Sequence, residues 1–303
     1  MRKTEIDPLR LLLFLLAGIV PAAAPALAQI GNSELFGTVR DASGLVVAGA
    51  EVEVRDAGTG RTVKAATNDG GAFYFFALEP GEYAVAVSKA GFAPLRRSGI
   101  HLRVADRVSL DLQLAIGDLS QTVDVSTSAP FLQTTTGAES FIADNIKVTT
   151  LPLDGRNFVP LVALAPGVAL PPGSTASPSL LPRINGSRPR TSEYIYDGIS
   201  VLQPEPGQVA YFPVIDAIEE FRVQLNSYSA EYGRSNGGVI QVETKSGTND
   251  FHGTLFEFFR NEGLNARNFF APFSPKPPVK RNQYGLALGG PVQKNRTFFF
   301  ADW

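Results

Sequence analysis

Few residues of this sequence are of types and at spacings that could carry out covalent chemistry. Cysteine is absent, which excludes a cysteine nucleophile, thiolate metal ligands and a disulfide framework. His101 has no histidine or glutamate near it at the spacing of metal ligands, so it is more typical of a structural histidine than of a zinc site. The stretches GSR and SAEYG do not combine with a histidine base into a catalytic triad. The sequence therefore predicts that the protein is not an enzyme.

Signals for cofactors, calcium and nucleic acid are also missing. Asp41 and Asp69 lie in turns that lack the repeated acidic ligands of a calcium loop, and no phosphate loop or dinucleotide fingerprint occurs. The formal net charge is −2, without a block of like charges, which argues against a nucleic-acid partner. We therefore expect no cofactor, no bound metal and no nucleic acid.

The N-terminus has the order of a secretory signal. Basic residues precede the apolar run LLLFLLAGIV (11–20), which Pro21 interrupts. A membrane anchor is the alternative, but the run is shorter than the roughly 20 residues that a spanning helix needs. We expect a signal peptide over residues 1–28, cleaved between Ala28 and Gln29.

Residues 30–115 predict a β-sandwich. The segments AEVEV (50–54), EYAVAV (82–87) and VSLDLQL (108–114) each alternate apolar and polar residues, which is the pattern of half-buried antiparallel strands. Turn sequences such as DASG, TNDGG and EPGEY separate them. Short strands at this spacing indicate a sandwich of about 80 residues.

The sequence then changes to short elements joined by glycine turns. Residues 116–138 form a polar linker with one short alternating stretch, QTVDVS. Residues 139–247 predict a small α/β domain, with a helix over 157–164, a short helix that runs into a strand at 221–224, and a strand over 238–244.

Aromatic-rich strands fill residues 248–303. Tyr284, Leu286 and Leu288 line one face of a predicted strand, and small or polar residues line the other, as in a transmembrane β-strand between lipid and lumen. A few such strands would leave unpaired backbone groups in hydrocarbon. We therefore expect Trp303 to interrupt a longer barrel.

Two regions resemble known families. The first is similar to the carboxypeptidase regulatory-like domain, a prealbumin-like sandwich that is not a peptidase. The residues that carry this resemblance are Gly37, Asp41, Gly44, Gly49, Ala50, Thr67, Gly71, Phe73, Leu78, Pro80, Gly81, Tyr83, Gly91 and Phe92.

The second region, with the stretches IEEFRV, AEYG and GGVI, resembles the plug domain of TonB-dependent outer-membrane receptors, in particular the Oar-like branch. The plug-motif residues are Glu219, Glu220, Arg222, Tyr232, Gly233, Arg234, Gly237 and Gly238. By the same resemblance, a TonB-box-like, partner-binding segment is formed by Thr122, Val123, Asp124, Val125 and Ser126. The resemblance implies a mainly β fold: an N-terminal prealbumin/Ig-like β-sandwich, a small α/β plug and the first strands of a truncated transmembrane β-barrel.

Both sets of residues have a second interpretation. The TonB-box-like segment is also consistent with one more strand of the sandwich, or with a linker strand. In the family, charged plug residues such as Glu219, Glu220, Arg222 and Arg234 contact the barrel. The alternative is that these four residues are solvent-exposed charges of a helix and a turn.

The resemblance implies the N-terminal portion of a TonB-dependent outer-membrane receptor for active uptake of a large solute, in which the plug gates the barrel. Expected partners are an inner-membrane TonB-type energy transducer, outer-membrane lipid and an unknown solute. The expected location is the cell outer membrane, with sandwich and plug facing the periplasm. A soluble periplasmic binding or adhesion module, or a non-functional truncated receptor, is the alternative.

Overall fold

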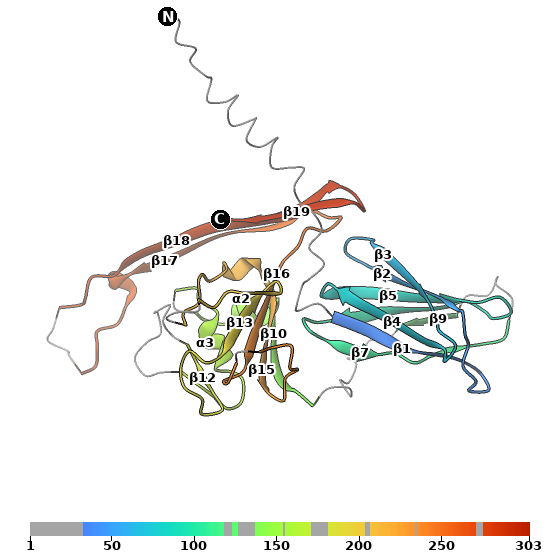
Figure 1. Ribbon diagram of the computed structural model, residues 1–303. Helices are drawn as coiled ribbons and strands as arrows, with labels where there is room; N and C mark the ends of the chain where they lie inside the picture. Colours follow the sequence, from blue (N-terminus) through green and yellow to red (C-terminus); the bar gives the residue numbers. More distant parts are fainter. Residues whose placement is uncertain are drawn as a thin grey trace, which may run out of the picture.

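Three parts follow one another along the chain in the computed structural model: a β-sandwich, a mixed α/β unit and a three-stranded meander (Figure 1). The structure describes residues 33–117, 123–126, 137–153, 155–170, 181–203, 207–233, 235–270 and 275–303. The predicted cleavage site at Ala28 and Gln29, together with Thr122 and Arg234, lies outside these ranges. Within them, no helix has the length and apolarity needed to cross a membrane.

The sandwich consists of two sheets that share one apolar core. Its strands are β1 (Ser33–Asp41), β2 (Glu51–Asp56), β3 (Thr62–Ala66), β4 (Ala72–Leu78), β5 (Gly81–Ser88), β6 (Leu95–Leu102), β7 (Arg107–Ser109), β8 (Leu112–Leu114) and β9 (Val123–Ser126). One sheet has the order β4-β1-β7, with β8 also paired to β1, and the other has the order β3-β2-β5-β6-β9. Val85 and Val87 of β5 are buried in the same core as Leu35 and Val39 of β1. The predicted sandwich is confirmed.

The strand predicted over 108–114 is divided into β7 and β8, both parallel to β1. At the division the amide of Leu110 donates a hydrogen bond to the carbonyl of Phe36 at 2.8 Å. A Cβ atom on Gly37 would lie 1.9 Å from the Leu110 carbonyl oxygen, so only glycine permits this approach. The apolar residues of the segment stay buried, which is why their alternation does not reveal the break.

The α/β unit is built on a five-stranded sheet of order β10-β15-β16-β13-β14. Its elements are β10 (Glu139–Asp144), α2 (Asn145–Thr150), α3 (Val159–Val162), β11 (Val168–Ala169), β12 (Arg183–Ile184), β13 (Glu193–Tyr196), β14 (Ile199–Ser200), the 3-10 helix η2 (Ile215–Ala217), β15 (Ile218–Asn226) and β16 (Val239–Thr244). Phe158, Tyr194 and Phe221 lie at the centre of its core. The ring centroids of Phe158 and Phe221 are 5.5 Å apart.

The strand that carries IEEFRV begins earlier than predicted. The sequence predicts a helix before Phe221, but only the short η2 forms and β15 already starts at Ile218. β15 pairs with β10 on one side and with β16 on the other. Pairing on both edges prevails over the local helical pattern, so Glu219 and Glu220 belong to a central strand.

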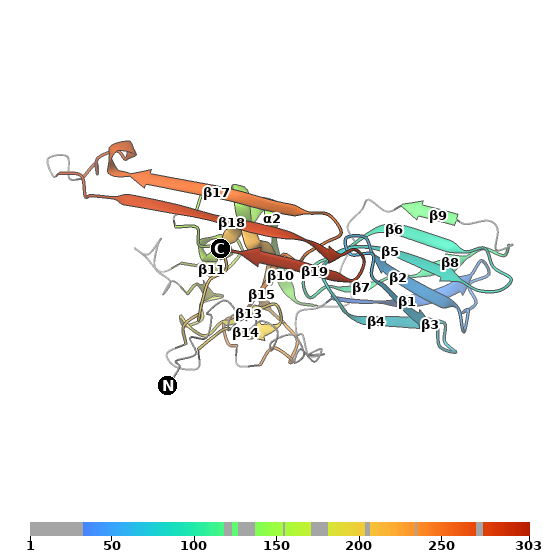
Figure 2. The ribbon, with the colours of Figure 1, turned by 90° about the horizontal axis from the view of Figure 1, so that it is seen from above.

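The meander contains β17 (His252–Asn261), β18 (Lys280–Gln293) and β19 (Thr297–Asp302), with the 3-10 helix η3 (Glu262–Leu264) between the first two. It extends over the α/β unit toward the sandwich (Figures 1 and 2). Its two faces differ as predicted. Tyr284, Leu286 and Leu288 are 63%, 40% and 44% exposed, whereas the residues between them are buried.

Candidate functional site: the joints around the α/β unit

The predicted motif residues do not form one cluster. Glu220 and Arg222 are buried side chains of β15, whereas Glu219, at the register shift between Ile218 and Glu220, is exposed. Tyr232 is buried, and Gly233 follows it on the surface. Gly237 and Gly238 are buried immediately before β16. The structure therefore separates charged residues that meet another part of the chain from residues that shape the α/β unit itself.

The glycine and tyrosine positions shape the α/β unit. The hydroxyl of Tyr232 lies 3.0 Å from Nε2 of Gln241, whose Oε1 accepts a hydrogen bond from Gln224 at 2.7 Å. Gly238 has a φ of +101° and its Cβ position lies 2.7 Å from the Gln224 carbonyl oxygen. These contacts assign a packing role to this part of the motif.

The sandwich contacts the α/β unit through the turn between β6 and β7, residues Arg103–Asp106. Arg222 forms an ion pair with Asp106, and its Nη1 donates to the carbonyl of Ala105 at 2.8 Å. The side chains of Arg222 and Asp106 are only 4% and 8% exposed. The amide of Val104 donates to the carboxylate of Glu220. We call this set of contacts the sandwich joint. Glu220 and Arg222 are thus neither solvated nor, within the described residues, in contact with the meander.

Asp106 is positioned for this contact by its own turn. Its Oδ2 accepts from the amide of Arg103 at 3.1 Å, and its amide donates to the carbonyl of Arg103 at 3.0 Å. Its Oδ1 is then available to Arg222. A buried ion pair stabilises a protein only when such further hydrogen bonds offset the desolvation of both charges. The planar guanidinium of Arg222 supplies them by binding a carboxylate and a carbonyl at once.

The pKa values of two carboxyl groups at the sandwich joint, those of Glu220 and Glu243, are raised. Glu243 of β16 is the register partner of Glu220 on β15. Burial raises the pKa of Glu243 to about 8, and the charges of Asp197, Glu79 and Glu220 add to the shift. Burial also raises the pKa of Glu220, although the Val104 amide and Arg222 oppose this. The joint therefore favours a protonated Glu243 near neutral pH.

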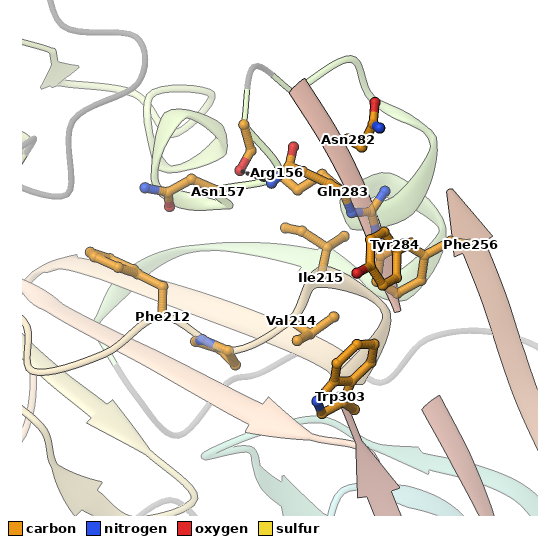
Figure 3. A pocket seen from close by; sticks show the side chains of 12 residues that line it. Arg156, Asn157, Phe212, Val214, Ile215, Phe256, Asn282, Gln283, Tyr284 and Trp303 are labelled. Atoms are coloured by element: carbon orange, nitrogen blue, oxygen red, sulfur yellow. Dashed lines mark hydrogen bonds between the residues drawn. The ribbon is translucent and has the colours of Figure 1, made fainter. Parts of the chain in front are cut away.

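A second joint connects the α/β unit to the meander through Arg156. Its guanidinium lies over the rings of Phe258 and Phe256, at 4.1 and 4.6 Å from their centroids, and forms an ion pair with Asp216. A pocket of about 500 Å³ lies alongside, lined by residues of both parts that include Phe212, Val214, Tyr284 and Trp303 (Figure 3). We call this set of contacts the meander joint.

Sequence analysis did not single out Arg156. It lies in the stretch LPLDGRNF, and its φ of +50° is unusual for a residue other than glycine. Arg156 and Phe258 are about one hundred residues apart in the sequence. No local sequence pattern therefore predicts their contact.

Asn249 connects the sandwich to the meander. Its amide donates to the carbonyl of Gly58 at 3.1 Å, and its Nδ2 donates to the carbonyl of Thr59 at 2.8 Å. Its Oδ1 accepts from the amide of Asn295, in the turn between β18 and β19, at 2.8 Å. The β2–β3 turn of the sandwich is thereby attached to the short turn of the meander. Among the described residues no group of His, Asp and Glu could hold a metal ion.

Comparisons with known proteins match the sandwich and the meander to two families. Residues 34–115 match the family described as carboxypeptidase regulatory-like domain, and residues 243–303 match the outer membrane beta barrel domain. The chain is 29% identical over 238 residues to the TonB-dependent transporter Oar of Myxococcus xanthus, an alignment that covers 74% of this chain and 22% of that protein. The chain thus spans about a fifth of the length of that relative.

Solved structures give a weaker likeness. The siderophore receptor PirA of Acinetobacter baumannii is 21% identical with a TM-score of 0.39, and the match covers 51% of this chain and 22% of that one. A ferric enterobactin receptor of Pseudomonas aeruginosa is 19% identical with a TM-score of 0.39, covering 53% of this chain and 24% of that one.

The expected resemblance to TonB-dependent outer-membrane receptors is confirmed by the domain matches and by Oar. The same matches assign the chain to the outer membrane. Oar is a transporter, in agreement with the prediction that the chain is not an enzyme.

Removing one partner of the buried ion pair should destabilise the chain strongly. We expect Arg222→Met to lower the free energy of unfolding by about 3–5 kcal/mol, because it removes the cation that forms an ion pair with the buried Asp106 carboxylate. Adding Asp106→Asn should recover much of this loss, since the amide oxygen still accepts from Arg103 and the buried negative charge is gone. Urea unfolding measures both effects. The exposed Glu219→Gln is the control, and an Arg222→Met variant as stable as this control would contradict the role of the joint.

Stability should fall as pH rises from about 4.5 to about 8. The pKa of Glu243 is raised from an ordinary value of 4.5 to about 8 in the folded chain, so the folded state binds a proton that the unfolded state has released. Stability then decreases with pH across that window. We expect Glu243→Gln to flatten the decrease in a pH series of urea unfolding curves. Glu219→Gln should keep the wild-type slope, and an unchanged slope in Glu243→Gln would show that Glu243 does not titrate in this way.

Replacing Phe258 by leucine should loosen the meander joint. Phe258→Leu keeps an apolar side chain but removes the ring beneath Arg156, a loss of about 0.5–2 kcal/mol. Phe259→Leu is the matched control, because Phe259 is the next residue on the opposite face of β17. Fluorescence of Trp303, the one tryptophan of the sequence, reports the unfolding of this region. Equal unfolding midpoints for the two variants would exclude a stabilising contact between Arg156 and Phe258.

Proposed function

We propose that the chain is a part of a TonB-dependent outer-membrane transporter, in which the α/β unit is the plug and the meander contributes to the barrel wall. The observation that carries the proposal is the two-sided meander. One face is occupied by Arg156 of the α/β unit, and the other exposes Leu255, Leu286 and Leu288. A barrel strand needs this arrangement, with an apolar surface toward lipid and an inner surface toward the plug.

The contacts of Asn249 support a periplasmic position for the sandwich. Outer-membrane barrels have short turns on the periplasmic side and longer loops outside. The β18–β19 turn is short, whereas β17 and β18 are separated by residues 262–279. The sandwich contacts the short turn through Asn249 and Asn295. The sandwich and the adjacent side of the plug therefore face the periplasm in our proposal.

Transport by such a chain is mechanical and non-covalent. An energised inner-membrane partner of the TonB type pulls an extended periplasmic segment, and the plug rearranges so that a large solute passes. In this chain the segment is Thr122–Ser126. The contacts that resist movement of the plug are the sandwich joint at Arg222 and the meander joint at Arg156. The solute is a large molecule.

A soluble periplasmic binding or adhesion module is the competing function. It would use the sandwich and the α/β unit without a barrel. The exposed apolar face of β17 and β18 argues against it, because a large apolar patch in water favours aggregation.

Fractionation and co-purification together test the proposed function. We expect the protein in the outer-membrane fraction of its source cells and, after in vivo cross-linking, in a complex with a TonB-type transducer. Deletion of residues 123–126 should abolish the complex, and deletion of residues 131–134, a control of equal length, should leave it intact. A protein found only in the soluble periplasm would contradict the proposal, as would a complex that forms equally in both deletion variants.

A further inference from the structure

β9 is an added edge strand of the sandwich. It pairs with β6 in parallel, with Leu95, Arg96, Arg97 and Ser98 opposite Val123, Asp124, Val125 and Ser126. It lies at the end of the sheet order β3-β2-β5-β6-β9 (Figure 2). The other strands of this sheet follow antiparallel to their neighbours. β9 therefore covers an edge that β6 would otherwise expose.

A bulge in β6 follows directly after the residues that pair with β9. Gly99 has a φ of +76°, and the register between β5 and β6 shifts between Tyr83 and Val85. Such a bulge bends a strand and interrupts its ladder. Within the described residues, the pairing with β9 runs from Leu95 to Ser98, immediately before the bulge. The described attachment is therefore four residues long.

A strand held in this way is exchangeable. Its affinity comes from main-chain hydrogen bonds, which any other free sheet edge can supply. β9 also lies between the sandwich and the α/β unit in the chain. Once it leaves β6, the chain from Gly117 to Glu139 could span roughly 70 Å when fully extended. Release of β9 therefore gives a distant partner access to a long tether without unfolding either core.

β6 also connects β9 to the sandwich joint. Its last residue, Leu102, is followed directly by the turn whose Val104 and Asp106 contact β15. One strand thus carries the attachment of β9 on its edge and the attachment of the plug at its end. The extended segment pairs with the first half of β6, and the sandwich joint follows the end of its second half.

We infer that the β6 edge and the inner-membrane energy transducer compete for the same main chain, so that the sandwich stores Val123–Ser126 as β9 until a free strand edge of the transducer captures it. This inference rests on the proposed function. It adds a resting site for the segment and makes the sandwich a regulator of access to it.

An engineered disulfide tests the competition. The full chain has no cysteine of its own, so Ser98→Cys and Ser126→Cys can cross-link only to each other, at positions that are register partners. We expect the disulfide to form under mild oxidation. The oxidised protein should bind the purified periplasmic domain of a TonB-type transducer at least ten-fold more weakly than the reduced protein, and reduction should restore wild-type binding.

The control is a second cross-strand pair, Arg55→Cys with Thr62→Cys, which joins β2 to β3 and leaves β9 free. It should bind equally in both redox states. If this control oxidises but the Ser98 and Ser126 pair does not, β9 is not held on β6 and the inference fails. Equal binding by the oxidised and reduced Ser98 and Ser126 pair would also overturn it. If the wild-type chain does not bind the transducer domain, the proposed function fails, and so does the inference that the transducer captures β9. Disulfide formation between positions 98 and 126 still shows in that case whether β9 pairs with β6.

Discussion

The ion pair between Arg222 and Asp106 determines how the first two parts of the chain meet. The sandwich and the α/β unit have separate apolar cores, so burial of apolar surface alone does not fix their relative position. A buried charge pair with additional hydrogen bonds does, because a small displacement would leave charges desolvated and unpaired. Val104 and Glu220 add a main-chain contact beside the pair. The geometry of one four-residue turn thereby orients a whole domain.

The meander depends on a different kind of contact. Arg156 holds β17 by its position over two phenylalanine rings, and Asn249 fixes the sandwich end of the meander by hydrogen bonds. Both contacts are small compared with the cores that they connect. In the proposed function this suits a plug that is stable at rest and still moves under a pulling force, since local polar contacts can break without unfolding a core.

The sequence predicted what depends on local periodicity. The alternation of EYAVAV and of RNQYGLALGG predicted the sandwich strand β5 and the two faces of β18, because one face of each strand is buried. Interactions between distant segments were not predictable in this way. IDAIEEF looks helical, yet it lies between two strand partners. The residues next to Arg222 and Arg156 in the sequence do not indicate that these arginines contact Asp106 and Phe258. For Val123–Ser126 the sequence left a sandwich strand and a partner-binding segment open as alternatives. The structure pairs the segment with β6, and the partner-binding role stays a prediction.

We expect the sandwich and the α/β unit to behave as one rigid body in the resting protein, because Arg222 is held by the turn that contains Asp106. A distance measurement by double electron–electron resonance tests it most directly, with spin labels on Thr62→Cys in β3 and Ile146→Cys in α2, both of which are exposed. The cysteine-free sequence makes the labelling specific. The account predicts a single narrow distance distribution. A broad distribution would show that the two parts move independently and would contradict it.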